Sequence, residues 1–266
     1  MLDSGISRFL SHNDIGSGLY VQGFPHPCHV NDRFLRSLSH SLPMFLTLAW
    51  IYAVAMTTRA IVQEKEARLA QMMMMMGLKE TVHRIAWFLS SLVPFLVSSS
   101  LLLLVLKFGK VLTNSDGVLL FIFLATFSMA TVAQSLLLST FFSQASLSSA
   151  CAGIIYFLLY LPYSVSMVWQ DQLTFSIRAT LSMISTVAFG LGVECIADLE
   201  EQGSGAQWSN IALSPSEESS YSLLTSILFM LLDTVVYALA TCYIESVFPG
   251  TGPSLHKVVF LLFELL

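Results

Sequence analysis

Residues 85–106, IAWFLSSLVPFLVSSSLLLLVL, form a run of 22 residues without a charged side chain. As an α-helix, which rises 1.5 Å per residue, this run would be roughly 33 Å long and could cross the hydrocarbon core of a bilayer. The composition agrees, because 11% of the residues are charged and 55% are hydrophobic, whereas soluble domains have about 25% and 45–50%. The run therefore predicts a membrane-spanning helix in an integral membrane protein.

Four further apolar runs predict membrane-spanning helices at about 39–56, 118–138, 150–169 and 222–243. Pro162 should kink or end the fourth span, because proline removes a backbone hydrogen bond. Another apolar stretch, 179–193, has only 15 residues and contains two glycines. That length suits a re-entrant or interfacial segment better than a crossing. The sequence therefore predicts an all-α polytopic membrane protein with about five transmembrane helices.

The connector at residues 59–84 carries five of the twelve Lys and Arg residues: Arg59, Lys65, Arg68, Lys79 and Arg84. Such a dense group of positive charge between two spans predicts a cytosolic loop. Counting spans from there places 107–117 and 170–221 outside, and 139–149 and the C-terminus inside. The positive charges of all loops together divide evenly between the two sides, so the density in this connector decides the orientation.

The centre of the charged connector, residues 63–76, has the pattern of an amphipathic helix. Glu64 and Arg68 are spaced as a favourable i,i+4 ion pair, and a stripe of apolar residues follows on one face: Leu69, Met72, Met73 and Met76. Gly77 stands where a glycine commonly ends a helix. The five consecutive methionines favour adaptable packing over metal binding. An amphipathic cytosolic helix between two spans predicts a surface on which a partner acts, although a solvated connector that only sets the orientation is the alternative.

Asp233 lies at the centre of the last predicted span. A carboxylate there costs about 2.5–3.5 kcal/mol on insertion scales, so it should face protein or water rather than lipid. No Lys or Arg occurs inside any predicted span. The sequence leaves three alternatives: a protonated carboxyl, a hydrogen bond to Thr234 or Tyr237, or a partner in another part of a larger assembly.

The acidic residues Glu194, Asp198, Glu200 and Glu201 form a cluster on the predicted outer side. Calcium binding is conceivable there, but a solvated loop is the favoured interpretation. The four cysteines show no zinc-ligand spacing, and a disulfide between Cys28 and Cys195 stays open, since both lie on that side. We therefore expect no metal and no cofactor in this chain.

Catalytic motifs are absent from the sequence. It contains no GxxxxGK[ST], no HExxH and no GxSxG pattern, which argues against ATP hydrolysis, zinc proteolysis and serine hydrolysis by this chain. No basic patch indicates binding to nucleic acid. We expect a protein that is not an enzyme by itself.

Several motifs resemble the A subfamily of ABC transporters, which are large two-half exporters of lipids. They are EKEARL at 64–69, MMGL at 75–78, PMFLTLAWIY at 43–52, STFFSQASLSSAC at 139–151, IIYFLLYLPY at 154–163, VAFGLG at 187–192, EEQGSGAQWSN at 200–210 and YIESVFPG at 243–250. The resemblance covers roughly residues 6–250. The chain looks like the first transmembrane half of such a transporter without its nucleotide-binding domain.

The resemblance implies three regions: the end of an extracellular or lumenal domain at 1–38, an ABC-2 type transmembrane domain at 39–248, and a divergent tail at 249–266. Within the second, residues 63–77 would be a coupling helix that meets the ATP-binding domain, with Glu64, Lys65, Glu66, Arg68, Leu69, Met73 and Met76 as its contact residues. Residues about 172–198 would form a re-entrant hairpin in the outer leaflet. Asp233 would hold a structural or gating position. Two departures are Thr186, which replaces a proline of the family, and Gln144, which replaces a basic residue.

The resemblance further implies a multi-pass protein of the plasma membrane or an endomembrane, with 63–77 and the C-terminus in the cytosol. It would be the permease portion of an ATP-driven exporter of phospholipid or sterol. Its partners would be membrane lipids, an ATP-binding domain holding ATP and Mg²⁺, and a second transmembrane half. Two alternatives stay open: a truncated fragment that does not transport, and an ATP-independent lipid scramblase or channel.

Overall fold

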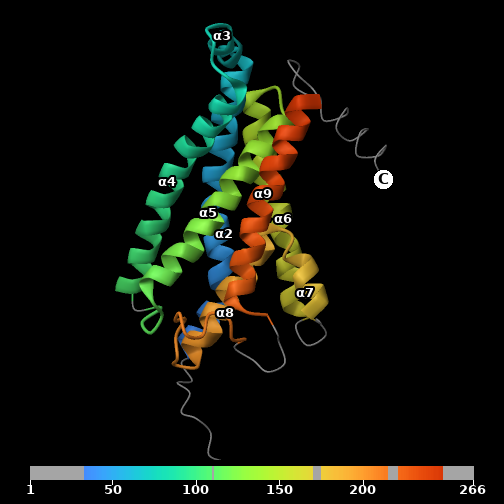
Figure 1. Ribbon diagram of the computed structural model, residues 1–266. Coiled ribbons are helices and arrows are strands. Elements are labelled where there is room, and N and C mark those ends of the chain that lie inside the picture. Colours follow the sequence, from blue (N-terminus) through green and yellow to red (C-terminus); the bar gives the residue numbers. More distant parts are fainter. Residues whose placement is uncertain (1–32, 110, 170–174, 215–220, 248–266) are drawn as a thin grey trace, which may run out of the picture. The chain divides into compact units, whose positions relative to one another are not determined.

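The computed structural model describes residues 33–109, 111–169, 175–214 and 221–247 (Figure 1). The predicted tail at 249–266 lies outside these residues, and so does nearly all of the predicted extracellular segment at 1–38. All regular structure in the described part of the chain is helical, which confirms the predicted all-α class.

Five helices of the described residues are long and apolar enough to cross a membrane. They are α2 (Arg33–Glu66), α4 (Glu80–Phe108), α5 (Gly117–Thr140), α6 (Ala145–Val168) and α9 (Leu223–Val247). Three shorter helices lie between them: α3 (Leu69–Met75), α7 (Phe175–Leu181) and α8 (Ser185–Glu201). The predicted number of spans is confirmed, and Pro162 lies inside α6 without ending it.

Helix α5 forms the core of the bundle, since most of its residues are buried and it packs against α2, α4 and α9. Its aromatic side chains join the elements around it. Phe127 stacks on Trp50 of α2 and on Phe189 of α8, with ring centroids 4.7 and 3.8 Å apart. The apolar core therefore includes α8 as well as the spans.

Helix α8 is a buried element, although it is too short to cross a bilayer. It packs against α2, α5, α6 and α9. Two glycines permit this close approach: a Cβ atom at Gly190 would lie 2.6 Å from the ring of Tyr163, and one at Gly192 would lie 2.5 Å from that of Phe123. The apolar stretch 179–193 is thus not one segment but the end of α7, a turn and the first half of α8. Two short helices joined by a turn therefore lie where one segment was predicted.

The connectors gather at two ends of the bundle. At one end, the Lys65 amine donates to the carbonyl oxygen of Ser139 at 3.3 Å, and the Ala145 amide donates to Glu66 Oε2 at 3.1 Å. At the other end, the Asp116 amide donates to the carbonyl oxygen of Ala206 at 2.8 Å. The connectors that the predicted topology puts on the same side of the membrane therefore meet in the structure: 59–84 meets 139–149, and 107–117 meets 170–221.

Residues 63–76 do not form one helix, so that prediction is wrong. Helix α2 continues to Glu66, Arg68 adopts a left-handed conformation with φ 54°, and α3 begins at Leu69 (Figure 1). The predicted apolar stripe, from Leu69 to Met76, lies entirely on the C-terminal side of this break. Gly77 does end α3, with φ 98° and with the amides of Gly77 and Leu78 bonded to the carbonyls of Met74 and Met73.

Candidate functional site

The α2–α4 connector is held to the bundle by a shared carboxylate. Glu245, near the end of α9, has one oxygen 3.5 Å from the Lys65 amine and the other 3.4 Å from Arg84 Nε. Lys65 lies in the last turn of α2 and Arg84 in the first turns of α4. One side chain of α9 therefore connects the helices on both sides of α3; we call this group the Glu245 clamp.

Further contacts fix the same end of α2. Glu66 accepts from the first amide of α6, and Glu64 lies 3.3 Å from Nε2 of His83 on α4. The predicted pair of Glu64 with Arg68 does not form in the described residues, because the helix ends between the two positions. The charged residues of 63–66 thus bind α2 to other spans rather than stabilise α2 itself.

Helix α3 itself has no buried residue. Of the predicted apolar stripe, Met73 is half-buried while Leu69, Met72 and Met76 are exposed. Met75 and Met76 are each 81% exposed. The predicted coupling residues thus fall into two groups. Glu64, Lys65 and Glu66 contact other helices and hold the connector in place. Leu69 to Met76 form an apolar surface that the described chain leaves uncovered.

At the opposite end, Glu200 joins α8 to the α4–α5 connector. Its carboxylate accepts three hydrogen bonds, from the Thr113 hydroxyl at 3.1 Å, the Asn114 amide at 2.7 Å and the Ser115 hydroxyl at 2.6 Å. The Lys107 amine donates to the carbonyl oxygen of Ser115. Glu200 is 5% exposed, so the solvated acidic loop predicted here is wrong for this residue. No group of three or more potential metal ligands occurs in the described residues.

Comparison with known proteins identifies the family of this bundle. Residues 30–243 match the model of the ABC-2 family transporter proteins. The chain belongs to this family. It is 53% identical to ATP-binding cassette sub-family A member 7 of Rattus norvegicus over 94% of its length, and 45% identical to retinal-specific phospholipid-transporting ATPase ABCA4 of Bos taurus over 99%. The identity to phospholipid-transporting ATPase ABCA7 of Homo sapiens is 50% over 94% of the chain. These matches confirm the resemblance to the A subfamily.

The ABC-2 chain spans 12% of the length of each of these relatives. The match lies in the membrane domain of the family.

Asp233 of the ABC-2 bundle is 2% exposed and faces protein rather than lipid, as predicted. It makes no hydrogen bond to Thr234, whose hydroxyl donates to the carbonyl oxygen of Met230 instead. Tyr237 lies one turn further along α9. The sequence placed Asp233 in the membrane, but its neighbours on other helices depend on the fold.

Two predicted outer residues lie side by side on α8. Burial raises the pKa of Glu194 to about 7; Asp198 adds to this shift and Arg178 opposes it. Cys195 is a free, buried thiol in contact with the carbonyl oxygen of Tyr221 at 3.7 Å. The structure therefore does not contain the disulfide that stayed open for Cys195, and its other half, Cys28, lies outside the described residues.

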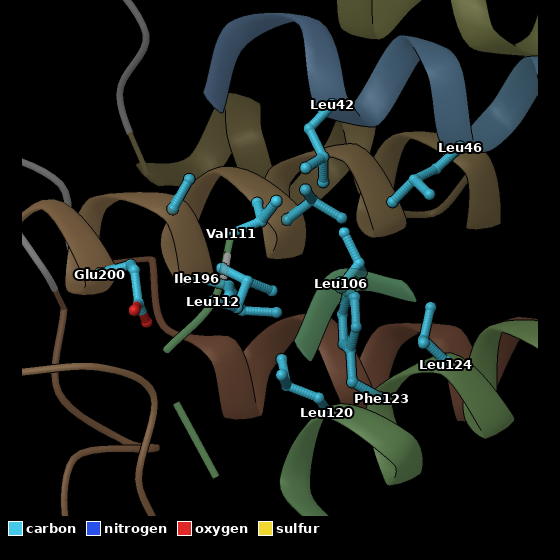
Figure 2. A pocket seen from close by; sticks show the side chains of 12 residues that line it. Leu42, Leu46, Leu106, Val111, Leu112, Leu120, Phe123, Leu124, Ile196 and Glu200 are labelled. Atoms are coloured by element: carbon cyan, nitrogen blue, oxygen red, sulfur yellow. The ribbon is translucent and has the colours of Figure 1, made fainter. Parts of the chain in front are cut away.

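A small apolar pocket lies near Glu200 (Figure 2). Its walls come from α2, α5, α8 and the end of α4 with the connector that follows, and include Leu42, Leu106, Phe123 and Ile196. The cavity volume is about 40 Å³, room for no more than a short piece of hydrocarbon. The carboxylate of Glu200 is already bonded to the connector, so the pocket offers no free polar group.

Proposed function

We propose that this ABC-2 chain is a permease part of an ATP-driven lipid exporter and that residues 63–77 transmit force to it from an ATP-binding domain. The observation that carries the proposal is that α3 is an uncovered apolar helix whose flanking residues are bonded to other helices. Helix α3 has no buried residue, and the residues beside it bind α4, α6 and α9. A partner seated on α3 would therefore act on four spans at once.

The surface of α3 has the chemistry of a docking site. Met75 and Met76 supply exposed, adaptable apolar contacts, and the exposed Arg68 and Lys79 lie beside the two ends of the helix. Burying one Met side chain at an interface contributes about 1.5–3 kcal/mol. Two such side chains are sufficient to make α3 a main contact of the complex.

The transported substrate would be phospholipid, with sterol as the second choice. Two of the relatives carry the name of phospholipid-transporting ATPases, and the bundle presents long apolar faces to a membrane. ATP and Mg²⁺ would be bound by the ATP-binding domain, and a second transmembrane half would complete the transporter. In this arrangement 63–77 and the C-terminus lie in the cytosol.

The test is recruitment of an A-subfamily ATP-binding domain to the chain in lipid nanodiscs. We expect the wild-type chain to bind this domain, and the double variant Met75→Asp/Met76→Asp to bind at least tenfold more weakly, because charged side chains replace the apolar contact. Leu213→Asp is the matched control, since Leu213 is 63% exposed beyond α8, far along the chain from α3. Equal binding of the double variant and the wild type would refute the role of α3.

Lipid movement separates the alternatives. Fluorescent phospholipid in proteoliposomes should move only when the ATP-binding domains, ATP and Mg²⁺ are present. Movement by the chain alone would support an ATP-independent scramblase or channel. Recruitment without any ATP-driven movement, in the assembly with the second transmembrane half, would support a fragment that does not transport.

A further inference from the structure

The apolar pocket of Figure 2 lies inside the end of the bundle opposite α3. Phe123 of α5 and Val193 and Ile196 of α8 line it, and each of these side chains is at most 4% exposed. Leu42 of α2 and Leu106 of α4 line it as well, but these two are only partly buried. The pocket therefore extends from the core of the bundle to residues at its surface.

The surface beside the pocket belongs to membrane-spanning helices. Helices α2 and α4 are both long and apolar enough to cross a membrane, and α4 packs mainly against α5, with much less contact to α2. Phe45 on α2 and Val105 and Phe108 on α4, all close in sequence to pocket residues, are exposed and apolar. In a bilayer, lipid chains surround such side chains. The surroundings of the pocket therefore supply hydrocarbon as its ligand.

The lining, size and depth of the pocket select the kind of hydrocarbon. All lining residues except Glu200 are apolar, and the Glu200 carboxylate is bonded to the 113–115 turn. The volume of about 40 Å³ is far below the roughly 150 Å³ of an engineered cavity that binds benzene. It suits a few methylene groups and not the rings of a sterol. Leu120 and Leu124 line the pocket about 5–10 Å from the start of α5, which is the depth of the upper part of an acyl chain.

A cation at the same end of the bundle has no carboxylate partner among the described residues. Lys107, next to Leu106 on α4, donates from its amine to the carbonyl oxygens of Ser115 and Thr113. The Glu200 carboxylate accepts from the 113–115 turn and not from Lys107. An ammonium group has three donors, so the amine can bind a further acceptor. A lipid phosphate group supplies both the acceptor and the opposite charge.

We propose that this pocket binds the upper part of one acyl chain of a membrane phospholipid and that Lys107 contacts the phosphate group of the same lipid. The chain lies against Val193 and Ile196 and so connects α8 to the lipid around α2 and α4. The site involves neither α3 nor an ATP-binding domain. It can therefore be tested separately from the proposed transport function.

Photolabelling of the chain in lipid nanodiscs tests the proposal. The nanodiscs contain a phosphatidylcholine with a diazirine in the upper half of one acyl chain, and the adducts are mapped by mass spectrometry. Val193 and Ile196 should be labelled several-fold more than Val187 and Phe189, which are buried on the same helix but lie outside the pocket. The exposed Val105 reports ordinary lipid contact. Equal labelling of the two pairs on α8, with Val105 labelled, would overturn the site.

A variant that fills the pocket adds a second criterion. Ala197 lines the pocket and is only partly buried, so Ala197→Leu places a larger side chain there. It should lower the labelling of Val193 and Ile196 several-fold. Ala86→Leu, on the exposed surface of α4 outside the pocket, is the matched control and should change nothing. Unchanged labelling in Ala197→Leu contradicts the proposal, and if this variant does not fold, the wild-type comparison decides.

The lipid class is tested by removing the phosphate from the probe. A diacylglycerol with the same photoreactive chain should label Val193 and Ile196 several-fold less than the phosphatidylcholine does, with each signal divided by that of Val105. The reason is that diacylglycerol offers Lys107 no negative charge. Equal labelling by the two probes would overturn the assignment to a phospholipid.

Discussion

Removing the carboxylate of Glu200 should destabilise the bundle, although no span is altered. Glu200 lies in the last turn of α8 and is the common acceptor for the 113–115 turn. In Glu200→Ala the buried Ser115 hydroxyl keeps its bond to the amide of Ala206 but loses its own acceptor. The Asn114 amide loses its acceptor as well. The Ser115 hydroxyl is then left without the partner that compensates its burial, whereas the amide of the exposed Asn114 can bond to water.

The size of the effect follows from these bonds. A hydrogen bond to a charged group contributes about 1.5–3 kcal/mol, and a donor left unpaired adds a penalty of similar size. The bonds from Asn114 and Ser115, at 2.7 and 2.6 Å, are the short ones, and the bond from Thr113 is longer at 3.1 Å. We expect a loss of about 3–5 kcal/mol. At roughly 2–4 °C per kcal/mol, the unfolding midpoint should fall by about 10 °C.

Thermal unfolding of the purified chain in detergent micelles, followed by size-exclusion chromatography, measures this change. Glu201→Ala is the control, because Glu201 is the adjacent carboxylate and is half-exposed. Its midpoint should stay within about 2 °C of the wild type, as surface substitutions usually cost less than 0.5 kcal/mol. A midpoint of Glu200→Ala that equals that of Glu201→Ala would refute the argument from the three hydrogen bonds.

Three further changes can be measured in the same unfolding assay. Gly192→Ala should cost about 1–3 kcal/mol, since its Cβ would lie 2.5 Å from the ring of Phe123, while Gly153→Ala, whose Cβ would meet only one atom at 3.4 Å, should cost almost nothing. Glu194→Gln should have little effect below pH 4.5 and should stabilise the chain above pH 7. The pKa of Glu194 is raised from 4.5 to about 7 by burial, so the folded chain holds the proton more tightly and loses on the order of 3 kcal/mol as the pH rises through this range. Glu245→Gln should cost about 1 kcal/mol at low salt and less at high salt, because the clamp is a partly exposed ion pair.

Each of these three predictions has an outcome that would contradict it. Equal midpoints for the two glycine variants would mean that α8 can move away from α5 without cost. A stabilisation by Glu194→Gln that is the same at pH 4 and pH 8 would show that its carboxyl does not titrate in this range. An effect of Glu245→Gln that does not change with salt would assign the loss to packing rather than to charge.

The membrane-spanning helices were predictable because each is coded by its own residues. A run such as 85–106 needs no tertiary contact to be recognised, since its length and lack of charge already exclude other structures. Gly77 was predictable for the same reason, because the end of a helix is decided by the backbone of a few adjacent residues. The break at Arg68 was not, since nothing in the side-chain pattern distinguishes a left-handed arginine from a helical one.

The role of the acidic outer residues could not be predicted, because it depends on segments about 85 residues apart in sequence. The sequence pattern predicts the same solvated loop for Glu194, Glu200 and Glu201. In the structure the path of α8 decides between them: Glu200 faces the amide and hydroxyl donors of the 113–115 turn, and Glu201, one residue and about 100° further round the helix, does not. The same reasoning applies to Asp233. The depth of Asp233 in the membrane follows from its place in an apolar run. The residues around Asp233 depend on how α8 packs into the bundle. Gly190 and Gly192 permit that packing, but no local sequence pattern predicts it.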